Sequence, residues 1–153
     1  MNKDEAWRQF CSLTNRRSEL EEKGDWEAAT SIQHEIIKAS QRYGTQKTSQ
    51  AWSRLGYIHH RNGQNELAED AVRQAINLHD ASGRNPEESL ATLQFQLAEI
   101  LATQNRFREA VSIGETAIEN FSILHNPPTD FLASREAEIE RMRAFRDKYL
   151  GEQ

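Results

Sequence analysis

Residues 52–80 read WSRLGYIHHRNGQNELAEDAVRQAINLHD, and this stretch decides the fold of the chain. It opens with the motif Trp-x-x-Leu-Gly, which ends at Gly56, and Ala68 and Ala75 follow twelve and nineteen residues later. Small side chains at these places let two helices approach closely, while the Trp and Leu fill the space beside them. The pattern therefore predicts a pair of closely packed helices.

The turn between the two helices is expected at Asn62-Gly63. Asn and Gly both tolerate a left-handed backbone, which a chain needs where it reverses direction. The dipeptide lies between Gly56 and Ala68, so the expected helices run antiparallel.

The same skeleton recurs 42 residues downstream. Leu97-Ala98 stands where Leu55-Gly56 stood, and the next two alanines follow at the same intervals of twelve and seven residues, at Ala110 and Ala117. A weaker third copy lies upstream around Ala29. Twelve residues before Ala29 the skeleton calls for a small residue, but the sequence has Arg17.

These residues resemble the tetratricopeptide repeat family, whose skeleton is W-x2-L-G…A…A. The family's usual period is about 34 residues, so the spacing of 42 is similar to its long-repeat, kinesin light chain-like branch. The resemblance implies an all-α fold, a right-handed α-solenoid of antiparallel helix pairs. Such repeats cover one another and need no chemistry of their own.

We expect a single domain over residues 1–153 with about seven helices. The predicted segments are repeat 1 (about 4–43), repeat 2 (about 45–81), repeat 3 (about 86–125) and a C-terminal capping helix (about 129–150).

Several local signals support these boundaries. Asp4 and Asp25 are expected to cap the first two helices, and Asn85-Pro86 is expected to open the fifth. Helical spacing places Leu67 on the buried face of the fourth helix.

The composition limits the classes of function. Net charge is −5 and charged residues make up 28% of the 153 residues, which disfavours a general nucleic-acid binder. The single cysteine, Cys11, fits a reducing compartment. The sequence shows neither a signal-peptide pattern at Met1 nor an apolar run of membrane-spanning length, so we expect a cytoplasmic protein without membrane contact.

No residue pattern predicts an enzyme, a cofactor site or a metal site. His59 and His60 are adjacent, so their rings diverge on a helix and cannot bind one metal as an i, i+4 pair could. His59 stands where the resembling family usually has a large apolar residue, which favours a partly buried packing role. The chain has no Gly-rich phosphate loop and no nucleophile motif.

The resemblance implies a concave groove lined by the first helix of each repeat. Tyr57 and Phe95 are aromatic residues expected on this otherwise polar face, and Arg and aromatic side chains favour binding. The alternative interpretation is a plain solvated face. The candidate peptide-binding residues are Gln50, Ser53, Arg54, Tyr57, His60, Arg61, Thr92, Phe95, Gln96 and Glu99.

The leading hypothesis is a non-enzymatic adaptor that binds a peptide or helix of a partner protein in this groove. Ser53 and Tyr57 stand where the chaperone-binding subgroup has its Lys/Asn clamp, so chaperone tails are not the expected ligand. Two alternatives stay open: a self-assembling, homo-oligomeric scaffold unit, suggested by Trp7 and by Phe131-Leu132, and a sensor module of a regulatory partner.

Overall fold

Helices are the only long regular elements in the part of the chain that the computed structural model describes, residues 1–79, 86–122 and 129–150. The chain divides into unit 1, Met1–Leu78, and unit 2, His79–Gln153, each with its own hydrophobic core. The prediction of one domain over the whole chain stays a prediction.

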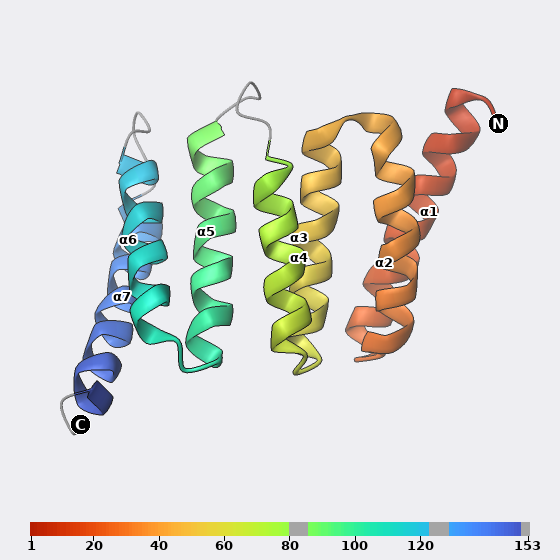
Figure 1. The fold of residues 1–153 in the computed structure, drawn as a ribbon. Coiled ribbons are helices and arrows are strands. Elements are labelled where there is room, and N and C mark those ends of the chain that lie inside the picture. Colours follow the sequence, from red (N-terminus) through yellow and green to blue (C-terminus); the bar gives the residue numbers. More distant parts are fainter. Residues whose placement is uncertain (80–85, 123–128, 151–153) are drawn as a thin grey trace. The chain divides into compact units, whose positions relative to one another are not determined.

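Unit 1 contains two antiparallel helix pairs, which Figure 1 shows running side by side. Its elements are α1 (Lys3–Glu22), α2 (Trp26–Ser40), the 3-10 helix η1 (Gln41–Tyr43), α3 (Thr45–Arg61) and α4 (Asn65–Asn77).

Caps and glycines fix where these helices begin and end. The side chain of Asn2 accepts a hydrogen bond from Glu5 N at 2.9 Å, so Asn2 caps α1 and the prediction of Asp4 was wrong. Asp25 caps α2 as predicted, by accepting from Ala28 N at 3.2 Å. Gly63 turns the chain between α3 and α4 with φ +76°, a backbone angle that favours glycine.

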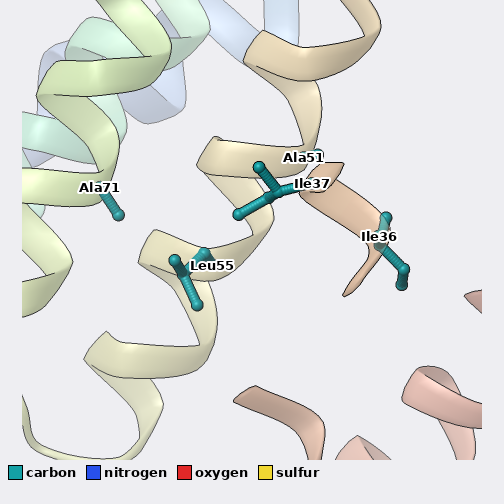
Figure 2. Close-up of a cluster of buried hydrophobic side chains, with 5 residues drawn as sticks. All are labelled: Ile36, Ile37, Ala51, Leu55 and Ala71. Carbon is teal, nitrogen blue, oxygen red and sulfur yellow. The ribbon is translucent and has the colours of Figure 1, made fainter. Parts of the chain in front are cut away.

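The core of unit 1 lies between α2, α3 and α4. Ile36 and Ile37 of α2 are buried with Ala51 and Leu55 of α3 and with Ala71 of α4 (Figure 2). The predicted small residues are buried as well. The skeleton of Leu, Gly and spaced Ala therefore does what its spacing predicts: it brings consecutive helices into direct contact.

Arg17 occupies the small-residue position of repeat 1, where it makes a polar contact with the neighbouring helix. Its guanidinium donates to Gln33 Oε1 at 3.2 Å, and Gln33, fully buried on α2, donates in turn to the carbonyl of Ala51 at 2.7 Å. A polar chain thus replaces the close backbone approach made elsewhere. Because Arg17 and Ala51 come from α1 and α3, this chain joins three consecutive helices.

Leu67 is a second departure from prediction. It was expected in the core, but its side chain is 49% exposed, whereas the next residue, Ala68, is fully buried. Leu67 lies in the first turn of α4, and about half of its surface is open to solvent.

Unit 2 consists of α5 (Pro86–Thr103), α6 (Phe107–Ser122) and α7 (Thr129–Leu150). Helix α6 packs against both α5 and α7. The predicted cap at Asn85 and the side chains of Phe131 and Leu132 lie outside the described residues.

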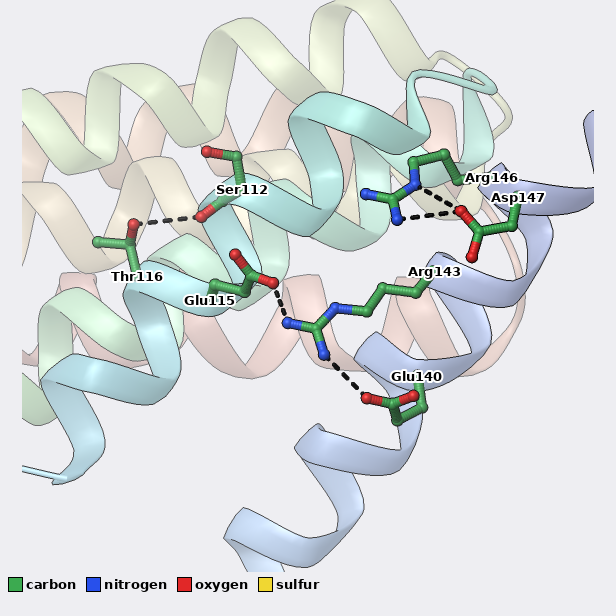
Figure 3. Close-up of polar contacts among 7 residues, drawn as sticks. All are labelled: Ser112, Glu115, Thr116, Glu140, Arg143, Arg146 and Asp147. Carbon is green, nitrogen blue, oxygen red and sulfur yellow. Dashed lines mark hydrogen bonds and ion pairs between the residues drawn. The ribbon is translucent and has the colours of Figure 1, made fainter. Parts of the chain in front are cut away.

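Helix α7 approaches α6 most closely at Gly114. A Cβ atom at Gly114 would stand 3.0 Å from Ile139 Cδ1, so the absent side chain leaves the room that Ile139 fills. Arg143 of α7 adds a polar link, because its guanidinium contacts both Glu115 of α6 and Glu140 of its own helix (Figure 3).

Candidate interaction surface

The six predicted residues of α3 lie along one side of the helix in unit 1. Gln50, Tyr57 and Arg61 are exposed, and Ser53, Arg54 and His60 are half-buried. Tyr57 keeps 39% of its surface open to solvent. This side of α3 is therefore partly exposed, and ligand binding on it stays a prediction.

Arg54 is held in place from α1. Its Nη2 donates to Glu21 Oε2 at 2.8 Å, and Arg17 Nε lies 3.3 Å from the same oxygen. The Glu21 side chain is only 7% exposed, so one buried carboxylate serves two guanidiniums. Burial and the neighbouring Arg54 lower the pKa of Arg17. Its guanidinium still stays charged at neutral pH, because an arginine is effectively always protonated there.

A ladder of cations and aromatic rings extends from Arg54. Its guanidinium carbon lies 4.5 Å from the centre of the Tyr57 ring, and Tyr57 meets Trp26 edge-on with ring centres 6.4 Å apart. Arg61 lies over the other ring of the pair, 5.6 Å from the centre of Trp26. Each contact is within the range of a cation–π or aromatic interaction. We call Arg54, Tyr57, Trp26 and Arg61 the α3 ladder.

Trp26 and Glu21 belong to this arrangement but are not among the ten predicted peptide-binding residues. No short-range pattern could have paired Glu21 with Arg54, because they are 33 residues apart and meet only through the packing of the repeats.

His60 adds no charge to this face at neutral pH. Burial and the nearby Arg61 both lower its pKa below the ordinary 6.5. The imidazole is therefore neutral near pH 7, and the positive charge of the α3 ladder comes from its two arginines. His59 is buried and shares a hydrogen bond with Gln64, Nδ1 to Oε1 at 3.0 Å, which confirms the packing role predicted for it.

The four predicted residues of α5 lie in unit 2. Thr92 is exposed, and Gln96 and Glu99 are half-buried. Phe95 is only 2% exposed, so the expectation that its ring faces solvent was wrong. Its ring stacks on Phe121 of α6 at 5.5 Å and packs with Ile139 of α7.

Phe95 is buried because two helices cover it. Arg135 of α7 lies over its other side, with the guanidinium carbon 4.9 Å from the ring centre. Arg135 also donates to Glu99 at 2.5 Å and to Glu138 at 3.0 Å. Burial, together with the negative charge of Glu138, raises the pKa of Glu99 despite this pairing.

The structure shows no candidate metal centre in the residues that it describes. No three His, Cys, Asp or Glu side chains among them are grouped so that they could bind a metal ion. Over the same described ranges, none of the helices combines the length and the apolar character that crossing a bilayer requires.

The comparisons with known proteins agree on the fold. The tetratricopeptide repeat model matches residues 47–122, while no curated protein matches the sequence. Among solved structures, the nearly identical TPR-like repeats of a Podosopora anserina protein described as a kinesin light chain align over 90% of this chain, with a TM-score of 0.74 and 14% identity. BtubC from P. vanneervenii aligns over 91%, with a TM-score of 0.75 and 19% identity.

A third similar structure has nearly the size of this chain. The Yersinia enterocolitica type III secretion chaperone SycD, solved with a peptide of the translocator YopD, has a TM-score of 0.68 and 20% identity. The alignment covers 93% of this chain and 95% of SycD, whereas this chain spans only 66% and 60% of the two proteins above. At such identities the likeness is one of fold.

The matched region contains the Trp-x-x-Leu-Gly motif and both pairs of spaced alanines, and those residues pack as the repeat requires. The predicted fold class, an all-α solenoid of antiparallel helix pairs, is confirmed. The chain belongs to the tetratricopeptide repeat family.

Proposed function

We propose that this protein is a non-enzymatic adaptor that binds a peptide or helix of another protein on the inner face formed by the first helices of its repeats. The observation that carries the proposal is the half-exposed α3 ladder of unit 1, which presents Arg54, Tyr57 and Arg61. Tyr, Trp and Arg supply most of the energy of protein interfaces.

The ladder is ordered before any partner arrives. Glu21 fixes one end of Arg54 and the Tyr57 ring supports its flat side, so little side-chain entropy remains to be lost on binding. The structure of SycD with a peptide of the translocator YopD describes that chaperone. It supports the proposal that a fold of this kind accepts a peptide.

The proposal includes three of the four predicted α5 residues. Thr92, Gln96 and Glu99 are the predicted residues of unit 2 that keep exposed surface, and Phe95 is left out because its ring is buried. For these residues, ligand binding stays a prediction.

Peptides selected from a random library on the wild-type protein would test the proposal. Tyr57→Ala and Arg54→Gln should each weaken the affinity of ladder-bound peptides at least about tenfold, the loss expected when a hot-spot contact is removed. Arg73→Gln is the matched control, because Arg73 is 44% exposed and pairs with a glutamate at 2.9 Å, while Arg54 is 41% exposed and pairs at 2.8 Å. Equal affinities for wild type, Y57A and R54Q would refute the proposal.

A self-assembling unit is the second candidate, and one observation favours it. Trp7 of α1 is 46% exposed although it stacks on Phe10 at 5.6 Å and meets Tyr43 edge-on at 5.3 Å. A large exposed ring in an ordered aromatic cluster suits a contact between copies. Sedimentation velocity over a range of concentrations tests it: Trp7→Ser should shift an oligomer to monomer, and a wild-type protein that is monomeric throughout would exclude it.

A further inference from the structure

Residues of the α1–α2 and α3–α4 turns line a cleft in unit 1. Both turns lie at the same end of the helix pairs (Figure 1). The cleft measures about 650 Å³, which is within the size range of protein ligand sites. The backbone at Gly24, which lines the cleft, leaves open space, since a Cβ there would meet nothing within 4 Å.

Two apolar side chains line this cleft without being covered by the fold. Leu67 is 49% exposed, and Trp26 is half-buried. An exposed leucine next to a fully buried Ala68 is not explained by the packing of α4, whose core contacts are made by Ala68, Ala71, Val72 and Ala75.

Repeat 3 shows that the repeat itself does not require a leucine there. Ala110 corresponds to Ala68, so Glu109 stands in repeat 3 where Leu67 stands in repeat 2. Glu109 is exposed and pairs with Arg106 at 2.7 Å. An exposed leucine at this position is therefore a feature of repeat 2 that repeat 3 does not share.

The charged residues that line the cleft are acidic, and Arg61 lies at its border, over the Trp26 ring. The acidic residues are Asp25 and Glu27, and none of the ten lining residues is lysine or arginine. The helix dipoles place about one positive charge in total at the N-termini of α2 and α4. The carboxylates of Asp25 and Glu27 carry two negative charges, so a net charge of about −1 remains. Asp25 is already fixed by its cap on Ala28 N, so its carboxylate is ordered before a ligand binds.

We propose that this cleft is a second docking site, which takes an apolar side chain of a partner segment together with a neighbouring lysine or arginine. Leu67 and Trp26 receive the apolar group, and Asp25 and Glu27 attract the cation. The site goes beyond the proposed function, and it shares one residue, Trp26, with the α3 ladder.

The test uses random twelve-residue peptides displayed on phage and selected on the wild-type protein, followed by affinity measurement of the free peptides. Selected peptides should pair an apolar residue with Lys or Arg. Leu67→Glu, which copies repeat 3, should weaken them at least tenfold. Glu27→Gln should weaken them about threefold and reduce their salt dependence.

Glu66→Gln is the matched control. Glu66 and Glu27 are both exposed glutamates in the first turn of a helix, α4 and α2, but only Glu27 lines the cleft. Glu66→Gln should leave the affinity unchanged. Circular dichroism confirms that each variant folds, and Leu67→Gln replaces Leu67→Glu if the latter does not.

Tyr57→Ala separates the two sites. Peptides that lose affinity with Y57A but not with L67E bind the α3 ladder, and if all selected peptides behave so, the cleft proposal is wrong while the proposed function stands. Selection of no peptide, or of cleft peptides without a basic residue, also overturns the cleft proposal. So does self-association of the wild type that L67E abolishes, since the occupant would then be a second copy.

Discussion

Arg54 of α3 donates to Glu21 of α1 across 2.8 Å, which links the first helices of two consecutive repeats through their side chains. The contact is asymmetric. The Arg54 side chain is 41% exposed, whereas the Glu21 side chain is 7% exposed and also faces Arg17. The two partners therefore contribute differently to stability, although they share one ion pair.

Glu21→Gln should lower the free energy of unfolding by about 1–3 kcal/mol, because it leaves the two guanidiniums without a compensating charge. Arg54→Gln should cost no more than about 1 kcal/mol, as expected for a solvent-exposed member of a pair. Urea denaturation of the two variants measures both. A cost of R54Q equal to or larger than that of E21Q would contradict the asymmetry.

Phe95 and Tyr57, predicted to be equivalent, should behave in opposite ways. Phe95→Ala removes a ring packed between Phe121 and Ile139 and should cost about 3–5 kcal/mol through the cavity it leaves. Tyr57→Ala, at a position 39% exposed, should cost less than about 1 kcal/mol. Chemical unfolding would show the difference directly, and similar losses for the two variants would be inconsistent with the burial of Phe95.

This contrast shows what the sequence could predict. The spacing of small residues predicted the helix pairs, because two helices can approach closely only where a side chain is small, regardless of the residues around it. Helical periodicity placed Tyr57 correctly, since α3 has a clear polar side. It failed for Phe95 because α5 is covered by more than one helix and has buried residues at 91, 93, 95, 97 and 98, which no single stripe predicts.

Polar contacts across repeats were out of reach for a different reason. Gln33 is fully buried because it bridges Arg17 and the Ala51 carbonyl, sixteen and eighteen residues away. Local propensity would have placed a glutamine at the surface. The prediction for Leu67 was wrong in the opposite direction, because this leucine of the expected buried face is 49% exposed.

Gly114→Ala tests the close approach of α6 and α7. Alanine is favoured over glycine in a helix by about 1 kcal/mol, but its Cβ would lie 3.0 Å from Ile139 Cδ1 and 3.1 Å from Cγ1. Ile139→Val removes the nearer of these atoms. We expect I139V to cost about 0.5–1.5 kcal/mol in the wild type and clearly less in the G114A background. A double-mutant cycle without such a coupling would show that the two residues do not compete for space.

Glu99 should make the stability of unit 2 depend on pH. Its pKa in the folded protein is raised above the ordinary 4.5 by burial and by Glu138, so the folded state holds a proton that the unfolded state releases. The contribution of this group to the free energy of unfolding therefore falls as pH rises from about 4.5 through the folded pKa, and it recovers on acidification.

The variant Glu99→Gln cannot titrate at this position. The stability of the wild type relative to E99Q should therefore rise as the pH is lowered from 7 to 4.5. Urea unfolding at a series of pH values measures the difference, with Glu119→Gln on the exposed side of α6 as the control for a general charge effect. A wild type that loses stability relative to E99Q on acidification would mean that the ion pair with Arg135 outweighs burial.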